Sequence, residues 1–155
     1  MIESETKNNN FSDLGEGFSR NTSERLQADL SKEKQALELI NQGNLTKAEQ
    51  IYRELVADKS KSHIVYGNLA ALCGMKGNRA EMIELLNEAL KIQPDFPDAH
   101  NNLGIAHHEE GNLNAAIHSY QAAIHLKPEY SEAHNNLGIA LKDQGNLKAA
   151  IISYQ

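Results

Sequence analysis

Four Gly-Asn dipeptides divide this chain into equal lengths, because each one lies 34 residues after the one before it. The dipeptides are Gly43-Asn44, Gly77-Asn78, Gly111-Asn112 and Gly145-Asn146. The similarity extends beyond them, since residues 99–121 and 133–155 differ at only six of 23 positions without a gap. A fixed period of this length is typical of stacked, similar structural units and not of one closed core.

The residues around each dipeptide predict a helix, a tight turn and a second helix. The glycine suits the left-handed position just past a helix end, where a Cβ atom costs about 1–2 kcal/mol. The asparagine suits the N-cap of the next helix, because its short side chain can accept from free backbone amides. Pro94 and Pro128 are expected to end the second helices of their units, and Ser60 holds the same position in the first unit.

Small and large residues alternate where the two helices of a unit must nest. The small residues of the first helices are Ala36, Ala70, Gly104 and Gly138, and the large residues of the second helices are Tyr52, Leu86, Tyr120 and Tyr154. Met82 replaces the alanine that other second helices carry at its position. This exception predicts a locally wider helix pair that is filled by a flexible side chain.

The two ends of the chain depart from the regular pattern. Residues 1–21 show no helical or strand period and predict a disordered tail, followed by a helix from near Thr22 or Ser23 to about Gln42. The repeat array then spans 22–155, with units at about 29–62, 63–96 and 97–130 and an incomplete unit at 131–155. We expect that the natural protein continues, and that an unfinished apolar end is a candidate surface for self-association.

Composition excludes several classes of partner. The formal net charge of −6 gives no basic footprint, so no nucleic-acid partner is expected. The acidic start has no apolar leader and no stretch is long enough for a membrane span, so we expect no membrane partner. Cys73 is the only cysteine, which fits a reducing, cytoplasmic location.

The spacing within the units resembles the tetratricopeptide repeat, a family of helix-turn-helix repeats, over about residues 29–155. In the unit at 97–130 the family pattern is carried by His100, Leu103-Gly104, His107, Ala116, Tyr120, Ala123 and Pro128. The resemblance implies an all-α, right-handed α-solenoid that binds a protein or peptide partner, without catalytic residues or cofactors.

The same resemblance implies that the first helices line a concave groove for an extended peptide or a partner helix. The implied groove positions are Ile64, Gly67, Asn68 and Ala71; Asp98, Asn101, Asn102, Ile105 and His108; and Glu132, Asn135, Asn136, Ile139 and Lys142. Asn68, Asn102 and Asn136 recur every 34 residues. An amide carries donors and an acceptor, so such a row can bind the backbone of any extended chain.

Two questions about this row stay open at the level of sequence. The asparagines are similar to the ladder in the repeat domain of O-linked N-acetylglucosamine transferases, but they can equally bond only neighbouring helices or water. The chain is accordingly expected to be a non-enzymatic interaction scaffold. The alternative is the N-terminal, substrate-recruiting region of a longer enzyme such as a glycosyltransferase of that kind.

Other chemistries are less well matched by the residues. A carboxylate clamp for an acidic peptide terminus needs Lys or Arg where this chain has Glu33, Asp98 and Glu132. Five of the seven histidines fall in one unit, yet none of these five is four residues from another, so no metal site is expected. Among them, His100 and His107 occupy packing positions. Cys73 is interpreted as a small buried hydrophobic residue.

Overall fold

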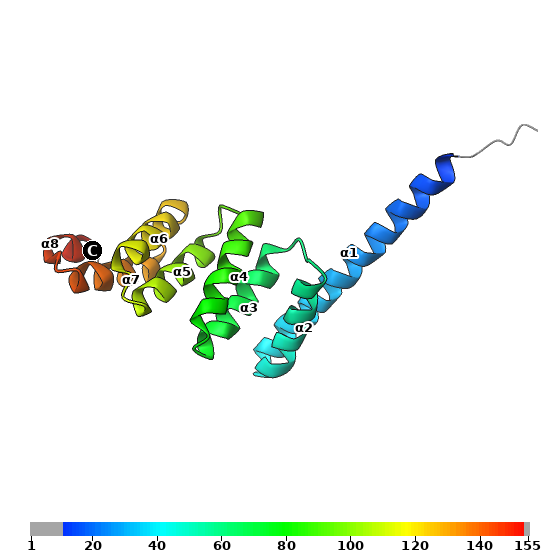
Figure 1. Ribbon diagram of the computed structural model, residues 1–155. Helices are drawn as coiled ribbons and strands as arrows, with labels where there is room; N and C mark the ends of the chain where they lie inside the picture. The colour runs from blue at the N-terminus through cyan, green and yellow to red at the C-terminus, as the bar shows by residue number, and fades with distance from the viewer. Residues whose placement is uncertain (1–10, 154–155) are drawn as a thin grey trace, which may run out of the picture.

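The chain folds into consecutive helices that stack along one direction (Figure 1). The computed structural model describes the backbone of residues 11–153 and the side chains of residues 22–153. The helices are α1 (Phe11–Asn41), α2 (Leu45–Ala57), α3 (His63–Met75), α4 (Arg79–Ile92), α5 (Pro97–Glu109), α6 (Leu113–Leu126), α7 (Ser131–Asp143) and α8 (Leu147–Ser153). Within this range no strand is present, so the predicted all-α solenoid of helix pairs is confirmed.

The Gly-Asn turns form as predicted. Their glycines have φ values of 75°, 76°, 78° and 87°. At the first turn, the N–H of Asn44 donates to the carbonyl of Leu39 at 2.8 Å, and the N–H of Gly43 donates to Ile40 at 2.9 Å. This pair of bonds is the Schellman motif, which needs a residue that tolerates a positive φ.

Three of the four asparagines also cap the following helix. Asn44, Asn78 and Asn146 each accept a hydrogen bond from the backbone N–H three residues further on. Asn112 is different, because its side-chain amide donates to the carboxylate of Glu110 at 3.2 Å. The predicted N-cap role therefore holds for all turns except the one before α6.

Two connectors between units are held by histidines. Of these, His100 was assigned only to packing from the sequence, and His134 was not singled out. α4 and α6 each end two residues before a proline, as predicted. His100 Nε2 lies 3.0 Å from the carbonyl oxygen of Pro94, and His134 Nε2 lies 2.8 Å from that of Pro128. The histidine ring therefore joins the first helix of a unit to the connector that precedes it.

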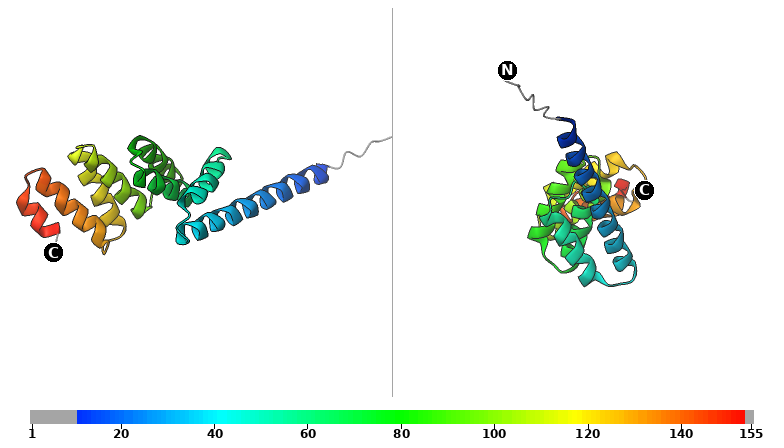
Figure 2. Two further views of the ribbon diagram at one scale, coloured as in Figure 1. Left: turned by 90° about the horizontal axis from the view of Figure 1, so that it is seen from below. Right: turned by 90° about the vertical axis from the view of Figure 1, so that its right-hand side faces the viewer.

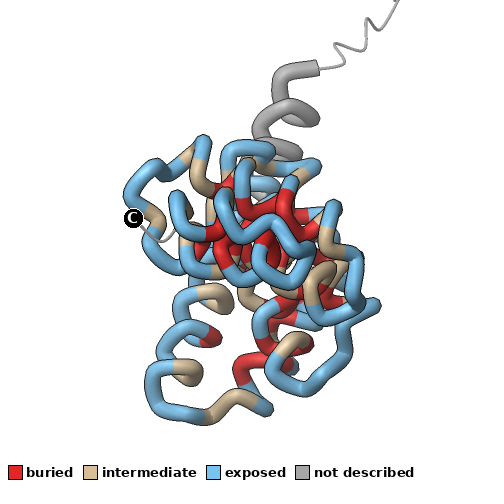
Figure 3. The backbone as a smooth tube through the Cα atoms, turned by 90° about the vertical axis from the view of Figure 1, so that its left-hand side faces the viewer, coloured by how far each residue is buried: buried red, intermediate tan, exposed pale blue. Residues whose placement is uncertain are grey.

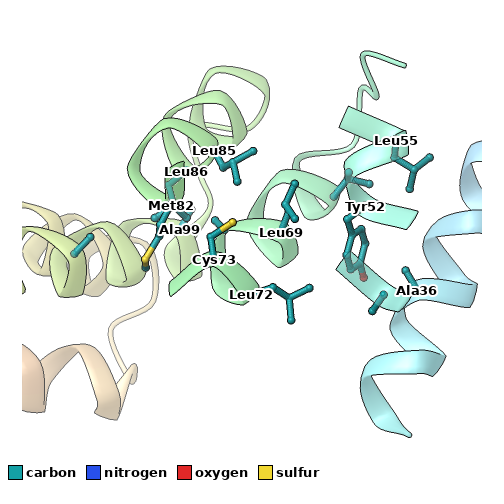
Figure 4. Close-up of a cluster of buried hydrophobic side chains, with 14 residues drawn as sticks. Ala36, Tyr52, Leu55, Leu69, Leu72, Cys73, Met82, Leu85, Leu86 and Ala99 are labelled. Atoms are coloured by element: carbon teal, nitrogen blue, oxygen red, sulfur yellow. The ribbon is translucent and has the colours of Figure 1, made fainter. Parts of the chain in front are cut away.

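The buried residues lie along the middle of the stack (Figure 3). The apolar side chains among them form two clusters. Figure 4 shows the first cluster, in which Tyr52, Leu69 and Leu86 are fully buried. In the third unit, a Cβ atom on Gly104 would lie 2.5 Å from Cε1 of Tyr120. The predicted nesting of a small residue against a large one is therefore the packing rule of this core.

The large side chain of Met82 fits its helix pair because the facing residue on α3 is a glycine. A Cβ atom on Gly74 of α3 would lie 2.8 Å from the sulfur atom of Met82 in α4. In the next unit, the corresponding residues are His108 and Ala116, so the large side chain is on the first helix instead. The volume gained at Met82 is matched by the volume lost at Gly74, and the sequence interpretation of a wider pair missed this compensation.

Salt bridges join the first unit to the second. Arg53 of α2 binds both carboxylate oxygens of Glu81 at 2.5 and 3.1 Å, and its Nε donates to Glu49 at 3.0 Å. Glu49 also accepts from the ammonium group of Lys76. The hydrogen bond from Lys76 lowers the pKa of Glu49, and the hydrogen bond from Arg53 lowers that of Glu81. These carboxylates therefore stabilise the fold in their ionised form.

α1 is the main departure from the regular array. It has 31 residues and begins at Phe11, so the helix expected from near residue 22 starts earlier. Figure 2 shows α1 (blue to cyan) as one continuous helix that extends beyond the stack. Extending a helix that has already formed needs no new nucleus, and residues 11–21 contain no proline to stop it. The remainder of the predicted tail, residues 1–10, lies outside the described residues.

Candidate functional site

The first helices α3, α5 and α7 form the inner layer of the stack. α3 contacts α5, and α5 contacts α7, whereas α2, α4, α6 and α8 make no comparable contacts with one another within the described range. In a curved stack, the layer whose helices lie closer together is on the inside of the curve. We call the exposed and half-exposed surface of α1, α3, α5 and α7 the first-helix face.

On α3 the predicted groove residues divide into surface and buried positions. Ile64 and Ala71 are exposed, while Gly67 is buried and a Cβ atom there would lie 2.9 Å from Cε1 of Phe96. Asn68 is half-buried and donates to the hydroxyl of Tyr52 at 2.9 Å. Gly67 therefore serves packing, and Asn68 has a structural bond in addition to any contact with a partner.

On α5 the surface positions are Asp98, which is exposed, and Asn102, Ile105 and His108, which are half-buried. Asn102 makes no side-chain hydrogen bond among the residues described. Asn101 is only 1% exposed, so it lies beneath the first-helix face and not on it. The family resemblance had placed Asn101 with the groove, because a repeat position does not reveal how deeply its side chain lies.

On α7 all the predicted groove residues reach the surface to some extent. Glu132, Asn135, Ile139 and Lys142 are exposed, and Asn136 is half-buried. Asn135 has no hydrogen-bond partner within the part of the chain whose side chains are described. The first-helix face of α7 is therefore the most open of the three predicted sets.

A chain of side-chain amides links α5 to α7. Nδ2 of Asn136 donates to the amide oxygen of Asn101 at 3.1 Å, and Nδ2 of Asn101 donates to Glu132 at 3.2 Å. The interpretation that the asparagines bond neighbouring helices thus holds for one N–H group of Asn68 and of Asn136. Each of these amides retains a second N–H group and an oxygen for which no protein partner is found in residues 22–153.

Tyr130 belongs to the same group of side chains, although no sequence argument singled it out. Burial raises the pKa of Tyr130, and its hydrogen bond to Asp98 and the charge of Glu132 raise the pKa further. The ammonium group of Lys127 lies 4.6 Å from the centre of the Tyr130 ring. The neutral hydroxyl of Tyr130 therefore lies near the negative charges of Asp98 and Glu132. Neither carboxylate forms an ion pair within the described residues.

His108 is paired across the units. Its Nε2 lies 2.9 Å from a carboxylate oxygen of Asp143, which belongs to α7. The predicted groove residue His108 is therefore held in place by the next unit. Sequence spacing missed this contact because the two residues are 35 positions apart.

Apolar side chains dominate the N-terminal half of the first-helix face. Leu26, Leu30 and Leu37 of α1 are 58%, 67% and 50% exposed, and Ile64 and Met75 of α3 are 43% and 71% exposed. They follow one side of each helix, since the steps of four and seven residues on α1 and of eleven residues on α3 are close to whole helical turns. Only Ile64 among them was named as a groove residue from sequence.

A hollow of about 430 Å³ lies between α1 and the start of α3. Its lining consists of Leu26, Asp29, Leu30 and Glu33 from α1, Ser60, Lys61 and Ser62 from the connector, and Ile64 from α3. α1 does not approach α3 as closely as α3 approaches α5. The wider spacing leaves room at this place for side chains of another molecule.

Other chemistries find little support in the described residues. No group of three or more His, Cys, Asp and Glu residues that are placed to hold a metal ion occurs in residues 22–153. Cys73 is buried, and burial raises the pKa of its thiol to about 11. In the described part of the chain, no helix is both long and apolar enough to span a membrane.

Comparison with known proteins identifies the repeats. A family model for the TPR repeat, the tetratricopeptide repeat, matches residues 76–111 and 106–145. Residues 76–145 therefore carry tetratricopeptide repeats. The matched residues run from the turn after α3 into the turn after α7, and the turns, nesting and connectors described above continue the same tetratricopeptide pattern through α2 and α3.

Solved structures share the tetratricopeptide fold. A crystal structure of MamA has 22% sequence identity and a TM-score of 0.76, covering 87% of this chain and 81% of MamA. A second MamA structure has 21% identity and a TM-score of 0.75, covering 81% and 69%. A monomeric IFIT1 mutant with Gppp-AAAA has 23% identity and a TM-score of 0.70, covering 83% of this chain and 33% of IFIT1. At these identities the likeness shows the fold alone. No curated protein matches the sequence at a significant level.

Proposed function

We propose that this tetratricopeptide chain is a protein-interaction module whose first-helix face holds a segment of a partner protein. The observation that carries the proposal is the set of five exposed, large apolar side chains on α1 and α3. Clustered exposed apolar residues on a folded protein mark interaction surfaces, whereas single ones need no explanation. The cluster belongs to the first-helix face of the first two units, where a bound segment would contact both units at once.

Side-chain amides supply the polar part of the binding surface. Within residues 22–153, Asn102 and Asn135 have no side-chain hydrogen bond, and Asn68 and Asn136 each keep an N–H group and an oxygen without a partner. An extended peptide exposes unpaired backbone donors and acceptors, which such amides can satisfy without reading side chains. The face therefore combines a sequence-tolerant row of amides with an apolar surface.

The chain's chemistry favours a protein partner over a nucleic acid. Gppp-AAAA is bound to IFIT1 in that structure. In this chain Asp29, Glu33, Asp98 and Glu132 lie on the first-helix face, where they would repel phosphates. A polypeptide segment is the ligand that fits these residues.

A second candidate function is recruitment of substrates for a longer enzyme. It rests on the row formed by Asn68, Asn102 and Asn136, whose likeness to the asparagine ladder of O-linked N-acetylglucosamine transferases remains a hypothesis. Both functions place a polypeptide on the same face and differ only in what is encoded after Gln155. Sequencing the gene downstream of that codon decides between them, since an immediate stop codon removes the enzyme alternative.

Self-association through the last unit is a further proposal for the same chain. Leu147, Ile151 and Ile152 of α8 are 61%, 60% and 72% exposed. Exposed apolar side chains at the end of a repeat stack favour pairing with another stack. Sedimentation equilibrium on the chain and on Ile152→Ser tests this, and a monomer at all concentrations contradicts it.

The groove proposal is tested by selecting random 16-residue peptides, displayed on phage, against the immobilised chain. The selected peptides are titrated against the chain and against Asn102→Ala/Asn135→Ala, which removes two amides that have no internal bond. A matched control is Asn87→Ala, because Asn87 is exposed on the second helix α4. Loss of affinity in the first variant alone supports the proposal. Equal affinity for all three proteins, or the absence of any selectable peptide, overturns it.

A further inference from the structure

The first-helix face changes character along the stack. At the second position of each unit, α1 and α3 carry Leu30 and Ile64, whereas α5 and α7 carry Asp98 and Glu132. These positions are related by the 34-residue repeat, so the four side chains follow one another across adjacent helices. The face therefore has an apolar half on α1 and α3 and an acidic half on α5 and α7.

The apolar half contains the hollow between α1 and α3, and carboxylates form part of its lining. Leu26, Leu30 and Ile64 provide its apolar lining. Two carboxylates, Asp29 and Glu33 of α1, and one ammonium group, that of Lys61, belong to the same wall, so negative charge is in excess. Neither carboxylate forms an ion pair with any residue whose side chain is described. An apolar side chain that enters this hollow is therefore favoured most when a positive charge accompanies it.

The carboxylates of the acidic half, Asp98 and Glu132, likewise form no ion pair with a described residue. Several carboxylates elsewhere are paired, such as Glu81 with Arg53 and Glu109 with Arg79. Asp98 and Glu132 form no salt bridge within residues 22–153. Among the predicted groove positions of α5 and α7, the one lysine is Lys142, in the last turn of α7. Unpaired surface charge of one sign attracts a ligand of the opposite sign.

The size of the face sets the length of the segment that covers it. Packed helices lie about 8–10 Å apart, and α1 lies further from α3 than α3 does from α5, so the three steps from α1 to α7 span at least roughly 25–30 Å. An extended chain covers about 3.3 Å per residue, which gives at least about eight or nine residues. One short segment is therefore long enough to contact both halves at the same time.

We propose that the first-helix face recognises a two-part basic segment, in which apolar side chains occupy the hollow between α1 and α3 and Lys or Arg side chains pair with Asp98 and Glu132. This inference rests on the proposed function, because it specifies the chemistry of the segment that the face holds. The two halves contribute through different forces. Salt therefore weakens the contribution of the acidic half and leaves that of the apolar half largely intact.

The experiment uses the random 16-residue peptide library displayed on phage and three forms of the full chain. These are the chain itself, Leu30→Ser/Ile64→Ser and Asp98→Asn/Glu132→Gln. Against the unaltered chain, we expect selected peptides to be enriched in Leu, Ile, Phe or Met at one end and in Lys or Arg at the other. Each double variant should lose the enrichment that its own half produces and keep the other.

Titration of one selected, fluorescently labelled peptide gives the magnitudes. Asp98→Asn/Glu132→Gln should weaken binding roughly three- to tenfold in low salt and have little effect in 0.5 M NaCl, about the range for two exposed ion pairs. Leu30→Ser/Ile64→Ser should weaken it by about tenfold or more at both salt concentrations. Controls matched in chemistry are Glu84→Gln/Glu129→Gln and Ile92→Ser, which change exposed residues outside the first helices and outside α8.

The outcomes separate this inference from the function on which it rests. If peptides bind through the groove asparagines but show no two-part enrichment, the inference is wrong and the proposed function stands. If the control variants weaken binding as much as the groove variants do, attraction is only to net negative charge or to general apolar surface, and the inference is again wrong. If no peptide depends on the groove asparagines, both fail. Circular dichroism confirms that each variant is folded.

Discussion

The ring of Tyr120 occupies the space in which a side chain on Gly104 would begin. Cε1, Cδ1 and Cζ of Tyr120 lie 2.5, 2.6 and 2.9 Å from the position of a Cβ atom at Gly104. Tyr120 is 2% exposed, so its ring has no free space into which it can move. The contact joins α5 to α6, and it places the asparagines of α5 relative to the rest of the unit.

The first prediction concerns this contact. Gly104→Ala should destabilise the chain by about 1–3 kcal/mol, because overpacking outweighs the better helix propensity of alanine. Gly104→Ala/Tyr120→Leu recreates the Ala70 and Leu86 pair of the preceding unit. The double variant should therefore be less destabilised than the sum of the two single variants. Urea denaturation measures all four proteins, and additive losses of stability would contradict the argument.

The fold was predictable from sequence wherever one residue decides the local structure. Gly43 adopts the expected positive φ, and Pro94 follows the end of α4, because each residue restricts its own backbone. The start of α1 was not predictable in the same way. No single residue in 11–21 determines whether the helix continues, so the outcome depends on the helix that follows.

The candidate site was predictable in position but not in depth. The repeat register placed Asn68, Asn101 and Asn102 on α3 and α5, yet it gave them equal weight. The structure buries Asn101 and gives Asn68 an internal bond to Tyr52, while Asn102 has no internal bond in the described residues. Burial depends on contacts between helices that are far apart in sequence, such as Asn101 with Asn136. Local periodicity carries no information on such contacts.

The second prediction uses this difference between the asparagines. Asn68→Ala should lower stability by about 1 kcal/mol, because it removes the bond to a buried tyrosine hydroxyl. Asn102→Ala should leave the Tm unchanged and weaken binding of a selected peptide by about 0.5–1.5 kcal/mol, the value of one hydrogen bond. Thermal melts and peptide titrations are run on both variants. A reversal of the two patterns would show that the roles are assigned wrongly.

The third prediction concerns acid sensitivity of the junction between the first two units. Hydrogen bonds from Lys76 and Arg53 hold the pKa values of Glu49 and Glu81 below the ordinary value of 4.5. A carboxyl whose pKa is lower in the folded state stabilises the fold above its unfolded pKa, and this contribution is lost as the pH falls through the folded value. Stability should therefore decrease as the pH falls below about 4.5.

The variant Glu49→Gln/Glu81→Gln isolates this effect. It should be less stable than the unaltered chain at pH 7 by about 1–3 kcal/mol, since it removes hydrogen bonds to charged groups. Its stability should change less between pH 5 and pH 3, as measured by urea denaturation. Glu84→Gln, which removes an exposed carboxylate without an ion pair, is the control. An equally steep acid dependence in the double variant would exclude this junction as its source.

The fourth prediction concerns Cys73. The thiol is 1% exposed, and burial raises its pKa to about 11, so little thiolate is present or accessible at pH 8. A chromogenic disulfide reagent should label the folded chain at least about a hundredfold more slowly than the chain in guanidinium chloride. Rapid labelling without denaturant would show that α3 opens readily or that Cys73 is not buried.

The central claim is that the first-helix face, and not the outer layer of second helices, binds the partner segment. Side-chain amide resonances of asparagine in ¹H–¹⁵N spectra report this directly, and Asn→Ala variants assign them. During titration with a selected peptide, we expect the resonances of Asn102, Asn135 and Asn136 to shift together with one dissociation constant. Asn87 and Asn114 on the second helices should not shift. Shifts confined to Asn87 and Asn114, with the first-helix amides unchanged, would contradict the claim.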